Sequence, residues 1–108
     1  MILEVAQLSV RSDESEAFES DFLKAQKIIC EMPGYVSHEL QRCLERENEY
    51  VLLVRWQSVE AHEVGFRGSA EYQKWKELLH HYYDPFPTVL HYEQVAGAIG
   101  ASLESGSK

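Results

Sequence analysis

The chain has 108 residues, a length that suits one compact domain with one modest core. Hydrophobic residues make up 44% and charged residues 26%, the balance of an ordinary folded protein rather than a disordered one. The 18 acidic residues outnumber the 10 basic ones, so the formal net charge is −8. Because such a surface repels phosphates and anionic lipids, we expect neither nucleic acid nor membrane partners.

The N-terminal residues lack the basic start and long apolar run of a secretory signal. Cys30 and Cys43 are too few for a disulfide framework and do not have the spacing of a zinc site. His80 and His81 are adjacent on an expected helix, where side chains point about 100° apart and do not easily share one ion. We therefore predict a cytoplasmic protein with reduced cysteines and no metal site.

Residues 2–10 are apolar and β-branched with partial alternation, which predicts a strand. We expect a helix to begin at Asp13, as its N-cap, with Glu16 completing a capping box. Pro33-Gly34 should end this helix. Its buried face is predicted from one apolar stripe, made by Phe18, Phe22, Ala25, Ile29 and Met32.

Residues 35–46 alternate in polarity, which predicts a long strand that a polar turn at 47–49 joins to a second strand at 50–57. One face of the first strand should hold Val36, His38, Leu40, Arg42 and Leu44. The second strand is apolar on both of its faces.

Ser58 is a candidate N-cap for a short helix that ends near Gly65, and Ser69 for the helix that follows. The apolar stripe of this second helix consists of Tyr72, Trp75, Leu79 and Tyr82. The sequence pattern of residues 88–95 predicts the last strand. We expect one domain over residues 1–95 and a flexible tail over residues 96–108, which are small, polar and rich in Gly and Ser.

The order of these elements predicts a ferredoxin-like β-α-β-β-α-β fold, an α+β domain with a four-stranded antiparallel sheet. Its two helices can cover only one face of the sheet, yet strand 50–57 is apolar on both faces. A bare apolar sheet face is rarely tolerated by a monomer. We therefore predict a homodimer in which two sheets pack face to face.

Three parts of the sequence form a recognisable pattern: Arg55–His62 (RWQSVEAH), Gly65–Ser69 (GFRGS), and Tyr72 with Trp75. Together they resemble the antibiotic biosynthesis monooxygenase (ABM) domain family of the dimeric α+β barrel group. The resemblance implies that two copies pair into a barrel, with a pocket between sheet and helices for a small aromatic or quinol-like molecule. It also implies a monooxygenase that uses dioxygen and no cofactor. The haem-degrading relatives carry a triad whose places are held here by Gln7, Phe66 and Lys76, so haem chemistry is not expected.

On this resemblance His62, His38 and Tyr72 are the candidate catalytic residues, because such a reaction needs a base and donors to a developing oxyanion. His62 would lie on the short helix, and His38 would point toward a buried face. Each also has an ordinary alternative: His62 as a polar residue on a helix flank, and His38 as a hydrogen-bonded core or interface histidine. His91, in the last strand, has the same two interpretations.

The candidate substrate-binding residues are Trp56, Phe66 and Trp75, as an aromatic wall, together with Arg67 and Arg55. The rings can equally be plain core, and Arg67 can be an exposed surface charge. If Arg55 is buried it needs a partner, either Glu39 on the neighbouring strand or a ligand carboxylate. A second hypothesis is that the protein is a non-catalytic dimer that binds a small ligand or serves in a stress response.

Overall fold

The structure is a computed structural model that describes residues 1–100. Residues 1–100 form four strands and two main helices, joined by two short helical segments. The strands pair in the order β2-β3-β1-β4, and every pair is antiparallel. This arrangement confirms the ferredoxin-like α+β fold. In chain order the elements are β1 (Ile2–Ser9), α1 (Ser15–Ile29), β2 (Tyr35–Arg42), β3 (Glu49–Trp56), η1 (Ala61–Phe66), α2 (Ala70–Leu79), η2 (His80–Tyr82) and β4 (Val89–Tyr92).

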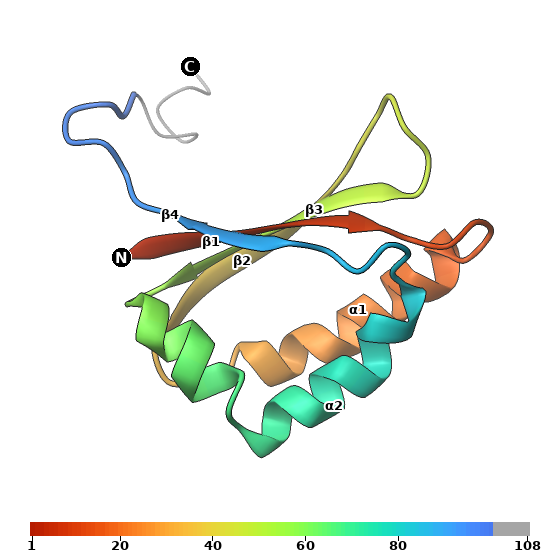
Figure 1. Cartoon of the computed structure of the whole chain (residues 1–108), viewed down its shortest axis with the longest axis horizontal. Helices are drawn as coiled ribbons and strands as arrows, with labels where there is room; N and C mark the ends of the chain where they lie inside the picture. The colour runs from red at the N-terminus through yellow and green to blue at the C-terminus, as the bar shows by residue number, and fades with distance from the viewer. Residues whose placement is uncertain (101–108) are drawn as a thin grey trace.

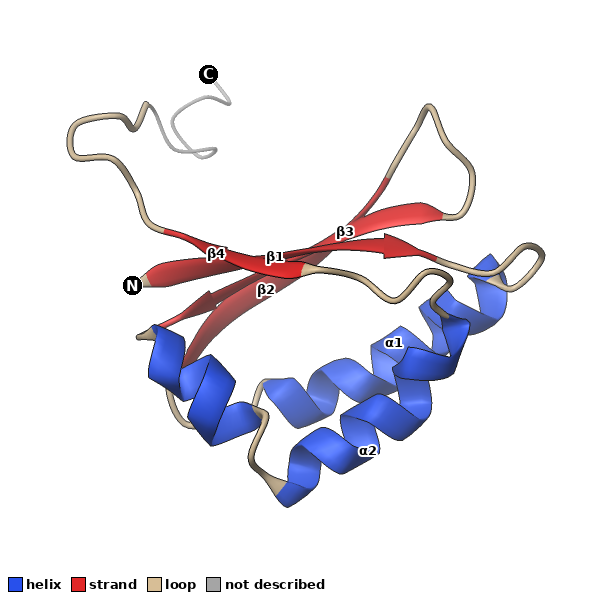
Figure 2. Cartoon of the chain, in the orientation of Figure 1, coloured by secondary structure: helices blue, strands red, loops and turns tan. Residues whose placement is uncertain are grey.

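All of the helices lie on one side of the sheet, as Figures 1 and 2 show. The core fills the space between the two layers, because alternate residues of each strand point toward the helices. The predicted stripe of α1 is confirmed from Phe18 to Ile29, which are buried. From β3 the buried side chains are Tyr50, Leu52, Val54 and Trp56.

The opposite face of the sheet carries apolar side chains that none of the helices within residues 1–100 covers. Val5 lies at its centre, paired with Leu53 on one side and Leu90 on the other. Leu90 is 52% exposed and its neighbour Tyr92 is 51% exposed. Strand β3 is thus apolar on both faces, as its sequence predicts.

The start of α1 differs from the prediction. The N-cap position is Glu14, which makes no side-chain capping hydrogen bond, so the predicted capping box is wrong. Asp13 has a φ of 67°, in the left-handed region, whereas an N-cap residue needs extended backbone. The Ser15 hydroxyl instead bonds the side chain of Asn48, which ties the first turn of α1 to the β2–β3 loop.

Two strands are shorter than predicted. Strand β2 ends at Arg42 and carries an irregularity between Tyr35 and Ser37, so Val36 is exposed instead of sharing the face of His38. Leu44 lies in the following loop and is 90% exposed, which corrects its assignment to that face. Strand β4 covers four residues, and residues 93–100 form no strand.

Of the predicted tail, residues 96–100 are exposed and form no helix or strand. Its remainder, residues 101–108, lies outside the described residues. No helix within residues 1–100 is long and apolar enough to cross a membrane.

A close approach at Gly34 fixes where the η1 segment lies. Gly34 has a φ of +84°, and a Cβ placed there would stand 2.5 Å from the Cβ of Ala61, the first residue of η1. The carbonyl of Gly34 also accepts a hydrogen bond of 2.7 Å from the backbone N–H of Gln57, just after β3. The turn after α1 therefore packs directly against the start of η1.

Candidate functional site

The η1 segment carries His62 and Phe66 into the protein interior, where both are buried. The predicted role of Ser58 is confirmed, since its hydroxyl accepts a hydrogen bond of 3.1 Å from the N–H of Ala61. Ser69 likewise accepts one of 3.1 Å from the N–H of Tyr72 and so caps α2. The segment is wound as a π-helix, a wide turn that is frequent at functional sites.

His62 meets a buried carboxyl group that the sequence analysis did not select. Glu4 of β1 is only 6% exposed, and its Oε1 accepts a hydrogen bond of 2.8 Å from the Nε1–H of Trp56. The Nε2 of His62 lies 3.4 Å from the same oxygen. The imidazole is stacked on the indole of Trp56 with the ring centroids 5.4 Å apart.

Burial favours the neutral form of both groups. It raises the pKa of Glu4 to about 7, although the Trp56 hydrogen bond and the Arg67 charge act in the opposite direction. It lowers the pKa of His62 to about 3, helped by the charges of Arg67 and His91. At neutral pH His62 is therefore an uncharged imidazole. The same low pKa makes it a weak base until an anion beside it favours the imidazolium form.

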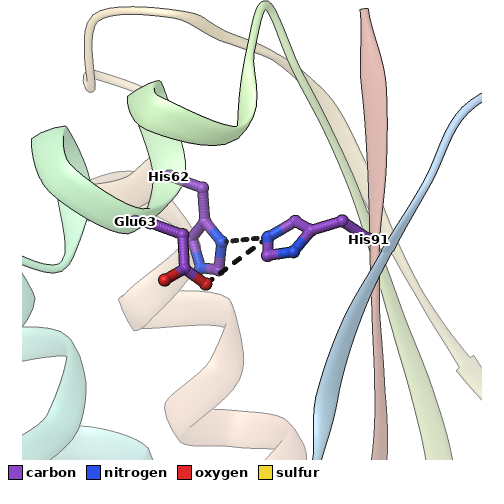
Figure 3. Close-up of side chains that lie close together, drawn as sticks. All are labelled: His62, Glu63 and His91. Atoms are coloured by element: carbon purple, nitrogen blue, oxygen red, sulfur yellow. Dashed lines mark hydrogen bonds and ion pairs between the residues drawn. The ribbon is translucent and has the colours of Figure 1, made fainter.

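The other nitrogen of His62 faces outward toward β4. Its Nδ1 lies 2.9 Å from the Nε2 of His91, which in turn lies 3.8 Å from the Oε2 of Glu63 (Figure 3). We call Glu4, His62, Glu63 and His91 the His62 cluster. The cluster extends from a buried carboxyl to a carboxylate whose side chain is 42% exposed, with one hydrogen bond, His62–His91, between two longer contacts. A proton relay along it requires those two contacts to close to hydrogen-bond distance.

Arg67 brings a positive charge to this cluster. Its Nη1 lies 3.7 Å from Glu63, one helical turn before it. Its Nε is buried and has no hydrogen-bond partner among the described residues. The same charge acts on Tyr72, where it lowers the pKa while burial raises it more strongly. An unpartnered buried donor beside a neutral base is suited to holding a developing oxyanion.

The predicted aromatic residues do gather beside His62. The Phe66 ring lies 5.1 Å from Tyr72, 5.6 Å from Trp75 and 5.7 Å from Trp56, measured between centroids. Trp56, Phe66 and Trp75 are buried and pack on one another, whereas Tyr72 is only half-buried. Of the residues selected from sequence, the structure therefore brings together His62, Tyr72, Arg67 and this aromatic group.

His38 and Arg55 lie elsewhere. His38, on β2, has its Nε2 2.9 Å from the Oε1 of Gln26 on α1, and burial lowers its pKa. It lines a hollow of about 420 Å³ between α1 and β2. Arg55 is exposed on the bare face of the sheet, because Val54 and Trp56 take the inward positions beside it. In the single chain Arg55 is therefore not buried, and the condition under which it would need a partner is not met.

Glu4, Glu63 and His91 were not selected from sequence as site residues. A signal for Glu4 does exist, because it alternates with Ala6 and Leu8, which face the core. A carboxyl group at an inward strand position is unusual enough to mark a site. His91 was considered as a base or donor but not selected, and Glu63 had no such signal. The proximity of these two residues depends on how η1 lies against β4.

Comparison with known proteins gives consistent results. The family profile described as "Antibiotic biosynthesis monooxygenase" matches residues 1–78. The uncharacterized protein YczJ of Bacillus subtilis is 47% identical over 95 residues, which span 88% of this chain and all of YczJ.

Solved structures show the same fold. A Bordetella bronchiseptica protein named for this family superposes with a TM-score of 0.84 at 31% identity, covering 87% of this chain and 96% of that one. SnoaB of Streptomyces nogalater, named a cofactor-independent oxygenase, superposes with a TM-score of 0.67 at 21% identity. The match covers 89% of this chain and 96% of SnoaB. The chain belongs to the antibiotic biosynthesis monooxygenase family.

Proposed function

We propose that this protein is a cofactor-independent monooxygenase that acts on a small aromatic, quinol-like molecule with dioxygen. One observation carries the proposal: a buried, uncharged His62 stands between a carboxyl group and a second histidine that leads to solvent. SnoaB, a family relative of similar fold, is named a cofactor-independent oxygenase, which supports the reaction type.

The first step is removal of a proton from the substrate. The Nε2 of His62 faces the interior and would take the proton, while the Nδ1–H passes one on to His91 at 2.9 Å. From His91 the proton can reach Glu63 and solvent. This route restores His62 to its neutral form after each turnover.

The substrate anion then supplies the electrons for dioxygen. In an anthrone-type substrate the reacting carbon is a CH₂ group that ends as a carbonyl. One oxygen atom enters that carbonyl, and the other leaves as water with the two hydrogens of the CH₂ group. The reaction balances without an external reductant. The unpartnered Nε of Arg67 would hold the oxyanion, and Phe66 and Tyr72 would contact the substrate ring.

We also propose that the protein acts as a homodimer whose sheets pack face to face. The bare apolar face around Val5, Leu53 and Leu90 supports this arrangement. A second copy of the chain offers the same apolar surface in return, as two-fold symmetry requires.

Oxygen uptake tests the proposed reaction. Chelator-treated protein is mixed with a panel of anthrone-type and polyphenolic compounds, and oxygen is followed with an electrode. We expect uptake above the rate without protein, and a fall of about 100-fold or more in His62→Asn, the range for loss of a general base. His81→Asn, an exposed histidine on η2, is the matched control and should keep the full rate. Uptake that is equal in wild type and His62→Asn would contradict the role of His62.

A second function, ligand binding without turnover, is favoured by the hollow beside His38. It has a volume of about 420 Å³ and includes apolar Phe22 and Leu40 beside charged Arg42. Native mass spectrometry of the purified protein tests it. A retained small molecule, together with no oxygen uptake on any compound of the panel, would favour this function over the monooxygenase.

A further inference from the structure

We propose that His62, Glu63 and His91 form a binding site for one divalent cation of the zinc class. We further propose that an ion bound there inhibits the proton transfer described above, and this second part rests on the proposed function. The first part does not depend on it.

The three side chains converge even though His62 and Glu63 are adjacent in η1, an arrangement that is not expected of neighbouring residues on a regular α-helix. One ligand atom from each lies within 4.8 Å of the other two, with separations of 2.9 Å between the histidine nitrogens and 3.8 Å from His91 to Glu63. Figure 3 shows the two rings and the carboxylate directed toward one another from η1 and β4. Ligands of a tetrahedral zinc ion, each about 2.0–2.1 Å from the metal, stand about 3.3 Å apart. Small side-chain movements would therefore bring the three ligand atoms to the separations that a zinc ion requires.

The chemistry of the donors fits the same ion. Two imidazole nitrogens and one carboxylate oxygen form a ligand set that zinc takes in catalytic sites, where a fourth position stays open to water or another ligand. The side chains of His91 and Glu63 are 19% and 42% exposed, so an ion can enter from solvent. The net charge of −8 also favours the approach of a cation.

A second observation, independent of the three ligands, concerns the far side of the His62 ring. Its Nε2 lies 3.4 Å from the Glu4 carboxyl, which is itself held by the Trp56 indole. Metal-bound histidines usually donate their second nitrogen to a carboxylate, which fixes the ring and directs the other nitrogen at the ion. Glu4 stands where it could take this role once it is ionised and the 3.4 Å contact shortens to a hydrogen bond. The His62 cluster therefore supplies both the ligands and the support that a metal site needs.

Metal binding and base action make opposite demands on His62. An ion on Nδ1 needs the lone pair there, so the ring proton must lie on Nε2, toward Glu4. Proton acceptance from a substrate in the interior needs the lone pair on Nε2. One bound ion would therefore both occupy the exit to His91 and remove the basic nitrogen.

The binding test uses Zn²⁺ alone, without any substrate. Metal-free protein competes for Zn²⁺ with a chromophoric chelator, and Co²⁺ serves as a second probe through its visible absorption bands. We expect one equivalent to bind, and affinity to fall at least about tenfold in Glu63→Gln and in His91→Asn. Glu4→Gln should weaken binding by about 10- to 100-fold, as loss of a supporting carboxylate does. Glu60→Gln and His81→Asn are the matched controls and should bind as wild type does.

Thermal unfolding of each variant shows that it is folded before binding is compared. Binding that is absent, or that is equal in wild type, Glu63→Gln and His91→Asn, would overturn the site. In wild type that consumes oxygen, one equivalent of Zn²⁺ should suppress uptake and a chelator should restore it. Uptake that continues with the site filled would overturn the inhibition alone. A failure of oxygen uptake in metal-free protein would count against the proposed function and leave the binding result unaffected.

Discussion

Glu4 occupies a position that sequence patterns alone assign to an apolar residue. It points inward from β1 between the sheet and η1, and it has two partners there, the Trp56 indole and the His62 imidazole. A single hydrogen bond does not replace the water that a carboxylate loses on burial, so the protonated form is favoured. The pKa of about 7 follows from this imbalance.

We predict that Glu4→Gln changes how stability depends on pH. The folded-state pKa is raised from 4.5 to about 7, so the folded protein holds a proton that the unfolded chain has lost across that range. Stability contributed by Glu4 is therefore full below pH 4.5 and is lost as pH rises to 7. The loss amounts to about 3 kcal/mol in order of magnitude.

Denaturant unfolding of both proteins between pH 4.5 and 8 measures this effect. His62 acts in the opposite sense, because its lowered pKa makes stability fall as pH drops from 6.5 toward 3. The difference in the free energy of unfolding between the two proteins isolates the contribution of Glu4. The stability of Glu4→Gln relative to wild type should increase as pH rises. Glu31→Gln, at an exposed position, is the control. A difference that does not change with pH would mean that Glu4 is ionised in the folded protein.

Several single residues could be predicted from sequence because their effects are local. Ser58 and Ser69 cap the segments that follow them, since a cap depends only on the next three residues. Whether Arg55 is buried could not be decided from sequence, because a charged residue in an apolar strand can lie on either face of the sheet. Its position needed knowledge of which face the helices cover.

At the scale of elements, the η1 segment determines whether a site exists at all. Its wide turns place His62 and Glu63 so that both reach His91 across the gap to β4. The start of η1 is held by the turn after α1, where Gly34 leaves room for Ala61. Any change that moves this turn should therefore move His62.

We predict that Gly34→Ala lowers both stability and oxygen uptake. The added Cβ would stand 2.5 Å from that of Ala61, and the φ of +84° is strained for any residue with a side chain. The conformational strain alone costs about 1–2 kcal/mol. Thermal unfolding and oxygen uptake provide the measurements.

Gly97→Ala is the matched control, because Gly97 has a φ of +81° and nothing within 4 Å of an added Cβ. It should leave uptake unchanged. If Gly34→Ala had the same unfolding temperature and the same rate of oxygen uptake as wild type, the close packing of the turn against η1 would be refuted.

The bounds of the elements were predictable only where the polarity pattern was regular. The stripe of α1 and the alternation of β3 gave the correct faces, because both patterns repeat over several residues. The start of α1 was wrong because Asp13 lies in the left-handed region, and β2 was too long because its end depends on pairing with β3. The His62–His91 contact could not be predicted, since it depends on tertiary packing of two elements that are distant in sequence.

At the scale of the whole molecule, the bare sheet face supports the proposed homodimer. Leu53 is paired with Val5 at the centre of that face. We predict that wild type has twice the mass of one chain in solution, and that Leu53→Arg shifts it toward a single chain, because a charge there would be buried without a partner. Light scattering at micromolar concentration measures both.

Leu23→Arg is the matched control, since Leu23 is an apolar residue on α1 that is 61% exposed and lies on the helical side. The particle mass of Leu23→Arg in solution should equal that of wild type. A wild-type particle with the mass of one chain would contradict the dimer, and so would a Leu53→Arg variant that stays fully paired.

The central claim is that His62 ionises a substrate in the protein interior, and binding without oxygen tests it most directly. An anthrone-type compound is titrated into metal-free protein under anaerobic conditions, at a pH below the pKa of the free compound, and the anion is followed by its absorption. We predict that wild type binds the compound as its anion and that His62→Gln binds it in neutral form. A compound that stays neutral in wild type, or ionises equally in His62→Gln, would contradict the claim.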